Sequence, residues 1–160
     1  FGENRFDLPA YYQQVAPEVV DCSGLTLPHK VEITELGPDS YGSVATVVAF
    51  LESSRNNREL IRINELLADS DVIKVVTLSK TEGVGLQVNN EIFEAYLNCQ
   101  FFYKDLKLRI EETEDVDIEL PLFLVDGDHV IGGLYIGEDK IDVDRLITEV
   151  EIMKKYNGEL

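Results

Sequence analysis

Two apolar segments rich in β-branched residues stand out in the middle of the chain. They cover residues 44–51 and 72–78, and each has the length and composition of a strand buried on both faces. Between them, after a polar break at residues 52–58, apolar residues recur at the spacing of a helix. The apolar positions of this predicted helix are Leu60, Ile61, Ile63, Leu66 and Leu67. Strand, helix and strand in this order predict a βαβ unit with two parallel strands.

The rest of the chain predicts two more helices and a hairpin. A helix is expected after Asn89-Asn90. Further on, apolar runs at residues 122–125 and 130–136 flank Asp126-Gly127, a favoured dipeptide for a tight hairpin turn. Acidic residues within 142–144 suit the beginning of a final helix. The predicted buried stripe of that helix is Val143, Leu146, Ile147, Val150 and Met153.

Two shorter segments alternate apolar and polar residues. Residues 31–36 and 105–111 therefore predict half-exposed strands. Prolines interrupt the first part of the chain, which predicts an irregular lead-in. The order of elements predicts an α/β fold with a mixed central sheet flanked by helices. Residues 1–41 are expected to form an N-terminal extension packed on a domain of residues 42–160.

This order resembles the thioredoxin-like superfamily, and two local patterns strengthen the resemblance. The apolar strand at residues 47–51 and the segment 52–58 after it are similar to the family's buried strand and the CxxC motif that follows it. Residues 119–127 are similar to the strand that the family opens with a cis-proline, here Pro121. The resemblance implies a thioredoxin-like fold over residues 42–156 and a cis Leu120–Pro121 peptide bond that faces the CxxC position.

The resemblance places arginines where the family has its redox residues. Arg55 falls on the first cysteine of the motif and Arg58 on the second. Residues 42–51 are particularly similar to the N-terminal domain of selenoprotein P, in which a selenocysteine would fall at Arg55. Thiol–disulfide exchange needs a thiolate nucleophile and a resolving thiol, and arginine supplies neither. We therefore expect no oxidoreductase activity at the usual site.

The same positions make the candidate binding site, whose residues are Arg55, Asn56, Asn57, Arg58, Leu120 and Pro121. Two arginines, two amides and free backbone N–H groups at a helix start are typical of an anion or carboxylate site. In the family, the backbone beside the proline pairs with an extended peptide, which implies a docking role for residues 120–121. The alternatives are that the arginines pair with Glu52, Glu59 or Glu65, and that the proline is a turn required by the fold.

Charge narrows the classes of partner. The chain has 31 acidic and 14 basic residues and a formal charge of −17. Such a surface disfavours nucleic acid and anionic membranes, because binding to both rests on Lys and Arg. No apolar run approaches the about 20 residues that span a bilayer, so no membrane insertion is expected. We predict a protein partner, no cofactor and no metal site, although the acidic run at 111–119 leaves weak Ca²⁺ binding open.

Two cysteines, Cys22 and Cys99, form neither a CxxC motif nor a cluster of metal ligands. The sequence leaves open whether they are free core thiols or one disulfide. The chain begins at Phe1 rather than Met, so we expect a processed or trimmed product. For the predicted interaction domain we expect a secreted or lumenal location.

Together these features predict a non-catalytic, redox-inactive, thioredoxin-like protein-interaction domain. Two other functions stay open. One is an enzyme or binder that uses the Arg55–Arg58 pocket for an anionic or glutathione-like ligand. The other is an acidic calcium-buffering or assembly domain.

Overall fold

A central strand, β1 (Ala45–Leu51), organises the structure, a computed structural model that describes residues 10–52, 57–110 and 118–157. Every side chain of β1 is buried, as its apolar sequence predicts. It pairs in parallel with β2 (Ile73–Ser79) and antiparallel with β4 (Pro121–Asp126). With β3 (Leu86–Gln87) and β5 (Ile131–Ile136) at the edges, the strand order is β3-β2-β1-β4-β5. The predicted mixed central sheet is confirmed.

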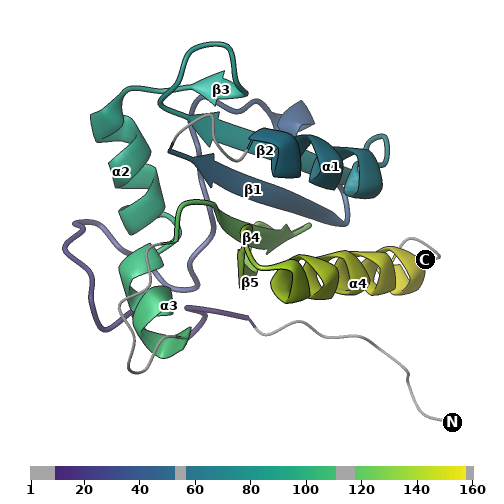
Figure 1. The fold of residues 1–160 in the computed structure, drawn as a ribbon. Helices are drawn as coiled ribbons and strands as arrows, with labels where there is room; N and C mark the ends of the chain where they lie inside the picture. Colours follow the sequence, from purple (N-terminus) through teal and green to yellow (C-terminus); the bar gives the residue numbers. More distant parts are fainter. Residues whose placement is uncertain (1–9, 53–56, 111–117, 158–160) are drawn as a thin grey trace, which may run out of the picture.

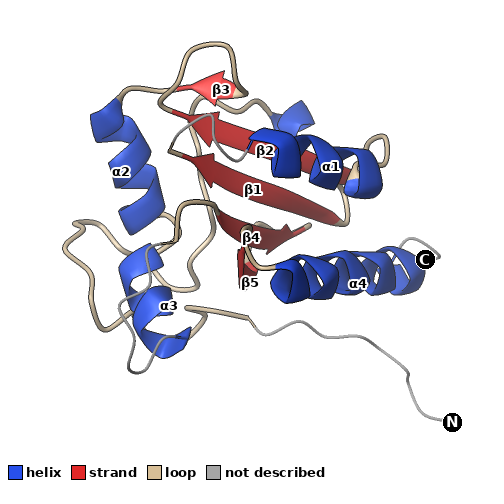
Figure 2. Cartoon of the chain, in the orientation of Figure 1, coloured by secondary structure: helices blue, strands red, loops and turns tan. Residues whose placement is uncertain are grey.

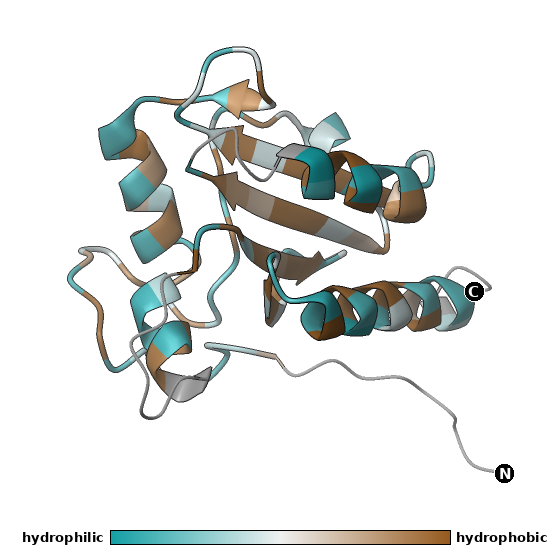
Figure 3. Ribbon diagram, in the orientation of Figure 1, coloured by the Kyte–Doolittle hydropathy of each residue, from teal (hydrophilic) through white to brown (hydrophobic). Residues whose placement is uncertain are grey.

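Helices cover both faces of this sheet (Figure 1). α1 (Asn57–Leu67) and α4 (Lys140–Asn157) pack on one face, and α2 (Asn90–Cys99) and α3 (Tyr103–Ile110) pack on the other. The strands therefore form a layer between helices, as Figure 2 shows. In Figure 3 the strands are mainly apolar, whereas the helices alternate apolar and polar patches.

Successive residues of β1 serve two separate cores, because side chains alternate across a strand. Val47 and Leu51 face α1 and α4, together with apolar residues of those helices. Val48 and Phe50 face α2 and α3. The second core is rich in aromatic side chains, among which Phe50, Phe93, Phe101, Phe102 and Phe123 are fully buried.

The predicted helices and hairpin are confirmed with small shifts of their bounds. α2 begins at Asn90, and the side chain of Asn89 caps it by accepting the backbone N–H of Ile92 at 2.8 Å. α4 begins at Lys140, slightly earlier than expected. In α1, however, Ile61 and Leu66 are each 53% exposed, so the buried stripe is narrower than predicted.

The strand predicted at residues 105–111 is wrong, because residues 103–110 form the helix α3. The apparent alternation does not match the environment, since Leu106 is buried whereas Leu108 is 58% exposed. The backbone N–H of Leu106 donates to the carbonyl of Phe102 at 3.1 Å, four residues earlier, as in a helix. Leu, Lys and Arg are good helix formers, which favours this outcome.

The other short strand, predicted near the N-terminus, does not form either. Its apolar residues Val31 and Ile33 are buried and alternate with the exposed Glu32, as predicted. Their backbone, however, has no strand neighbour. The N–H of Val31 donates to the carbonyl of His129 at 2.8 Å, and that of Glu32 donates to the side-chain oxygen of Gln100 at 2.8 Å. The alternation of apolar and polar residues therefore arises because Val31 and Ile33 are buried on the α2 side of the sheet, and not because the segment is a strand.

Residues 10–41 pack against the α2–α3 side of the sheet and contain a short 3₁₀ helix, η1 (Pro38–Ser40). Tyr12 is buried in the aromatic core, and its carbonyl accepts the backbone N–H of His29 at 2.9 Å. This bond closes residues 13–28 into a loop whose two ends lie side by side. None of the helices in the described part of the chain combines the length and apolar character needed to cross a membrane.

Candidate functional site

The end of β1 and the beginning of β4 meet at one edge of the sheet. Ala49 pairs with Leu122, so Pro121 lies beside the carboxyl end of β1, where the chain leads into α1. Pro121 also pairs with Ile136, the last residue of β5, after which α4 begins. We call this region the candidate edge, consisting of Glu52, Asn57, Arg58, Leu120 and Pro121 with the starts of α1 and α4. It is the end of the sheet at which parallel α/β units usually bind ligands.

Part of the predicted binding segment can be placed on this edge. Arg55 and Asn56 lie outside the described residues, and Asn57 is the first residue of α1. Arg58 is exposed and forms no ion pair with any described residue. Its neighbour Glu52 pairs with Lys80 at the end of β2, at 3.9 Å. The predicted alternative, an arginine paired with Glu52, is thus not what the structure shows for Arg58.

The Leu120–Pro121 peptide bond is trans, so the predicted cis-proline is wrong; among the described residues the cis bond is Leu27–Pro28. The Leu120 backbone is also already bonded within the chain. Its N–H donates to Glu138 Oε1 at 3.0 Å, and its carbonyl accepts the N–H of Gly137 at 2.8 Å. A Cβ on Gly137 would approach Leu120 Cδ2 to 2.4 Å, so the close contact requires glycine. These bonds hold Pro121 in an extended strand.

A small hollow opens beside this edge, between α1 and the start of α4. Its volume is about 170 Å³. It is lined by Glu59, Arg62, Ile63, Gly137, Glu138, Lys140, Val143 and Asp144. Arg58 and Arg62 are four residues apart on α1 and therefore share a face of the helix.

Three cations at this edge, Arg58, Arg62 and Lys140, form no ion pair with described residues. Some cations elsewhere do, as Lys74 pairs with Asp71 and Lys154 with Asp69. Exposed guanidinium and ammonium groups without a carboxylate partner among the described residues are suited to bind one from outside. Arg62 and Lys140 were not among the residues predicted from the sequence, although the four-residue spacing from Arg58 is a readable signal for Arg62.

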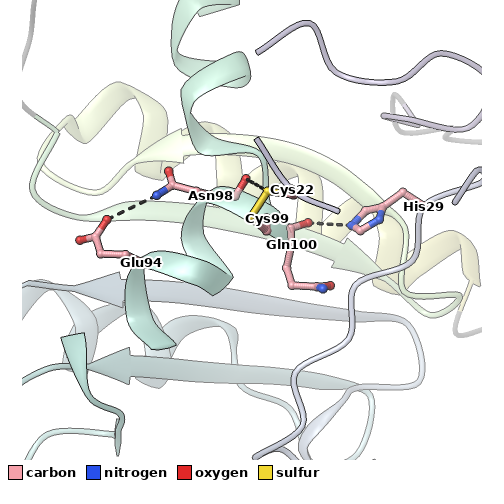
Figure 4. Close-up of a disulfide and its surroundings, with 6 residues drawn as sticks. All are labelled: Cys22, His29, Glu94, Asn98, Cys99 and Gln100. Carbon is pink, nitrogen blue, oxygen red and sulfur yellow. Dashed lines mark hydrogen bonds between the residues drawn. A yellow bond between two sulfur atoms is a disulfide. The ribbon is translucent and has the colours of Figure 1, made fainter. Parts of the chain in front are cut away.

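The two cysteines lie on the face of the sheet that α2 and α3 cover, and they form one disulfide, Cys22–Cys99. It joins the N-terminal extension to the last residue of α2, and both residues are half-buried (Figure 4). Of the two alternatives that the sequence left open, the structure contains the bridge. Both cysteines lie outside the sequence segments that form the candidate edge, and residues 52–58 contain no cysteine or methionine.

His29 lies beside this disulfide and fastens the extension to the α2–α3 turn. Its Nε2–H donates to the carbonyl oxygen of Gln100 at 2.7 Å (Figure 4). The centroid of its ring lies 4.6 Å from that of Phe102, edge to face. Because a carbonyl only accepts, the bond to Gln100 assigns the proton to Nε2. Burial lowers the pKa of His29 below its ordinary value of 6.5, and the hydrogen bond to Gln100 only partly opposes this.

We therefore expect acid to destabilise the fold through His29. Since the folded pKa lies below the unfolded one, the unfolded state takes up a proton first as the pH falls. The contribution is intact above pH 6.5 and is lost as the pH falls below it through the folded pKa. Urea unfolding at pH 7.5 and pH 5.0 should show a smaller acid loss for His29→Gln, which keeps an N–H donor, than for the wild type. His129→Gln, at the other histidine, is the matched control. Equal acid losses for all three proteins would contradict the assignment.

No group of three or more His, Cys, Asp or Glu residues in the described ranges is arranged to hold a metal ion. The residues at 111–117, in which the sequence left weak Ca²⁺ binding open, lie outside those ranges. Glu119, the acidic residue of that run within the described ranges, donates its N–H to Glu138 Oε2 at 2.7 Å.

No protein-family model and no curated protein matches the chain. Solved structures do resemble it. The exposed lipoprotein thioredoxin Etrx1 of Streptococcus pneumoniae is 18% identical, with 68% of this chain and 87% of that chain covered and a TM-score of 0.37. A thioredoxin-like protein of Parabacteroides distasonis is 14% identical over 75% and 90%, with a TM-score of 0.41. A SCO1/SenC family lipoprotein of Bacillus anthracis is 12% identical over 74% and 86%, with a TM-score of 0.45.

At these identities and TM-scores the neighbours carry no argument about function. The fold itself is visible in the chain's own topology. A five-stranded sheet of order β3-β2-β1-β4-β5 joins a parallel βαβ unit to an antiparallel hairpin, with helices on both faces. The chain has the α/β fold, with a mixed central sheet flanked by helices, that its sequence predicts.

Proposed function

We propose that this chain is a non-catalytic thioredoxin-like domain, redox-inactive at the position of the family's CxxC motif, that binds a carboxylate-bearing segment of a protein partner at the candidate edge. The observation that carries the proposal is the set of three cations there, Arg58, Arg62 and Lys140, without ion pairs among the described residues. Carboxylates of Glu59 and Asp144 line the same hollow, so the cations would bind an acidic segment by direct contact and not through a positive net field. Arg55, Asn56 and Asn57, which precede Arg58, complete the proposed binding segment.

The distribution of sulfur supports a non-catalytic role. The chain has two cysteines, and both are used in the disulfide on the α2 side of the sheet. In our proposal, the family's redox dithiol has been replaced by Arg55 and Arg58, so the edge retains a docking role without the chemistry. A disulfide of this kind persists in oxidising compartments, which fits a secreted or lumenal protein.

The size of the hollow favours a binder over an enzyme for a small anionic ligand. Its volume is about 170 Å³, whereas small-molecule sites typically enclose about 300–1,000 Å³. A partner that lies across the edge needs no such enclosure. Because the Leu120 N–H and carbonyl are bonded to Glu138 and Gly137, we propose that the partner binds through its side chains and not by adding a strand at Leu120.

Charge reversal at the edge is expected to abolish this binding selectively. The probe is a pair of fluorescent decapeptides, one rich in Asp and Glu and the other with Asn and Gln at the same positions. Fluorescence anisotropy should detect the acidic peptide only. Arg58→Glu with Arg62→Glu should weaken it at least about tenfold, since a charged hydrogen bond contributes about 1.5–3 kcal/mol.

The matched control is Lys74→Glu with Lys155→Glu, which changes the net charge equally. Lys155 lies 15 residues along α4 from Lys140, or about 22 Å at the helical rise. Equal losses in both double variants would show a general charge effect and contradict the proposed site. Reduction of insulin disulfides above a no-protein blank, persisting in Cys22→Ser with Cys99→Ser, would contradict the non-catalytic assignment.

A further inference from the structure

The Cys22–Cys99 disulfide lies in the wall of a hollow of about 580 Å³, larger than the one beside the candidate edge. One wall comes from the extension around Cys22 and the other from α2, so the bridge joins the two walls. Both cysteines are half-buried and line the hollow. The volume is within the range of small-molecule sites. This hollow shares no lining residue with the one beside the candidate edge, although Lys80 contacts both Glu52 of that edge and Glu94 of this hollow. The inference drawn from it does not rest on the proposed function.

The charge around the bridge is strongly negative. Four carboxylates, Glu18, Asp21, Glu91 and Glu94, and a single cation, Lys104, line the hollow. Glu94 also contacts Lys80 at 3.1 Å and accepts from the Asn98 amide at 3.5 Å (Figure 4). A thiol that enters the hollow therefore passes a negative field, which favours a positively charged reagent and disfavours an anionic one.

The bridge also fastens a loop that has few other attachments. Residues 13–28 leave the core at Tyr12 and return at His29, and the backbone bond between those two residues closes the loop at its base. Between these points Pro17 is buried, and the N–H of Glu18 donates to Asp105 Oδ1 at 3.0 Å. Val20 and Leu25 pack, partly buried, against the aromatic core, and most other side chains of the loop are exposed. Cys22 is thus the covalent attachment of the outer half of the loop to α2.

We propose that the Cys22–Cys99 disulfide is a thiol-exchange site selective for small cationic thiols, and that its opening frees residues 13–28 from α2. A thiolate attacks one sulfur of the bridge to form a mixed disulfide, and the other sulfur leaves as a thiolate that takes a proton from water. A second thiol then attacks the mixed disulfide and departs with the first as a small-molecule disulfide. Two thiols are oxidised for each bridge reduced.

The selectivity is tested with three thiols of different charge. Cysteamine is cationic, 2-mercaptoethanol is neutral and 2-mercaptoethanesulfonate is anionic. The rate of bridge reduction, per thiolate, is divided by the rate with a neutral unstructured peptide disulfide, which removes differences in intrinsic reactivity. At low ionic strength the normalised rate should be on the order of tenfold higher for cysteamine than for the sulfonate, with mercaptoethanol between them. Equal normalised rates would overturn the proposal.

A matched pair of variants separates the hollow from the overall charge of the protein. Asp21→Asn with Glu91→Gln removes two carboxylates from the hollow and should reduce the preference for cysteamine at least about twofold. Glu82→Gln with Glu151→Gln makes the same change of net charge at exposed residues outside it, and should leave the preference unchanged. The same reduction in both variants would overturn the site, because the preference would then follow net charge alone.

The release of the loop is tested with a glutamate-specific protease. In the reduced protein, cleavage after Glu18 should become at least about tenfold faster, whereas cleavage after Glu151, in the middle of α4, should not change. Cys22→Ser with Cys99→Ser should show the fast cleavage without any thiol. Unchanged cleavage after Glu18 in both proteins would overturn the role of the bridge in holding the loop.

Discussion

Replacing Phe50 with alanine is expected to lower the free energy of unfolding by about 3–5 kcal/mol. Phe50 is fully buried on the α2–α3 side of β1. Its ring centroid lies 5.3 Å from those of Phe93 and Phe101 and 5.7 Å from that of Phe123, all near edge to face. Alanine would remove three aromatic contacts and leave a cavity between a central strand and a helix, which the backbone cannot close. Urea unfolding followed by circular dichroism measures the loss.

Two further variants serve as controls for Phe50→Ala. Leu108→Ala removes a side chain that is 58% exposed on α3 and should change the free energy of unfolding by about 0.5 kcal/mol or less. Phe50→Leu fills part of the cavity and should fall between the wild type and Phe50→Ala. A loss below about 1 kcal/mol for Phe50→Ala would mean that this aromatic cluster is not a rigid core.

Removing the disulfide is the second large effect. Cys22→Ser with Cys99→Ser should lower the free energy of unfolding by about 4 kcal/mol, because the bridge closes a loop with a sequence separation of 77 and restricts the unfolded chain. The folded state should survive, since the aromatic core and the bonds of the extension to Ile131 and His129 remain.

The matched measurement uses the wild type in reductant. Reduced wild type and the double serine variant should unfold at the same urea concentration, and reductant should not shift the variant. A reduced protein as stable as the oxidised one would contradict a stabilising bridge.

The long periodic segments could be predicted from the sequence, because their patterns extend over several turns or a whole buried strand. β1 and β2 are continuous apolar runs, and the hairpin combines two such runs with Asp126-Gly127. The short segments could not. Over six or seven residues, alternation describes a strand, a helix with one exposed leucine such as Leu108, or a loop against a core equally well. Which of these structures forms depends on contacts with residues that are distant in sequence. For the segment around Val31 these are Gln100 and His129, which accept its backbone hydrogen bonds.

The candidate site, too, has parts that could be predicted from the sequence and parts that could not. The family resemblance predicted that Pro121 would lie near the end of β1, and β4 pairs with β1 so that Leu122 lies opposite Ala49. The conformation of the proline could not be predicted from the motif, because it depends on the bonds of Leu120 to Glu138 and Gly137, residues of another loop. Lys140 was missed for a related reason, since only folding brings the start of α4 beside α1.

The extension bears on how this sheet meets other chains. An edge strand exposes a row of backbone groups that can template pairing with a second molecule. Here β5 is such an edge, and the extension donates the Tyr11 N–H to the carbonyl of Ile131 at 3.1 Å. The opposite edge, β3, consists of two residues and offers little length for pairing. Residues 10–41 thus occupy a backbone acceptor at the start of this edge, and a second chain that added a strand to β5 there would have to displace that bond.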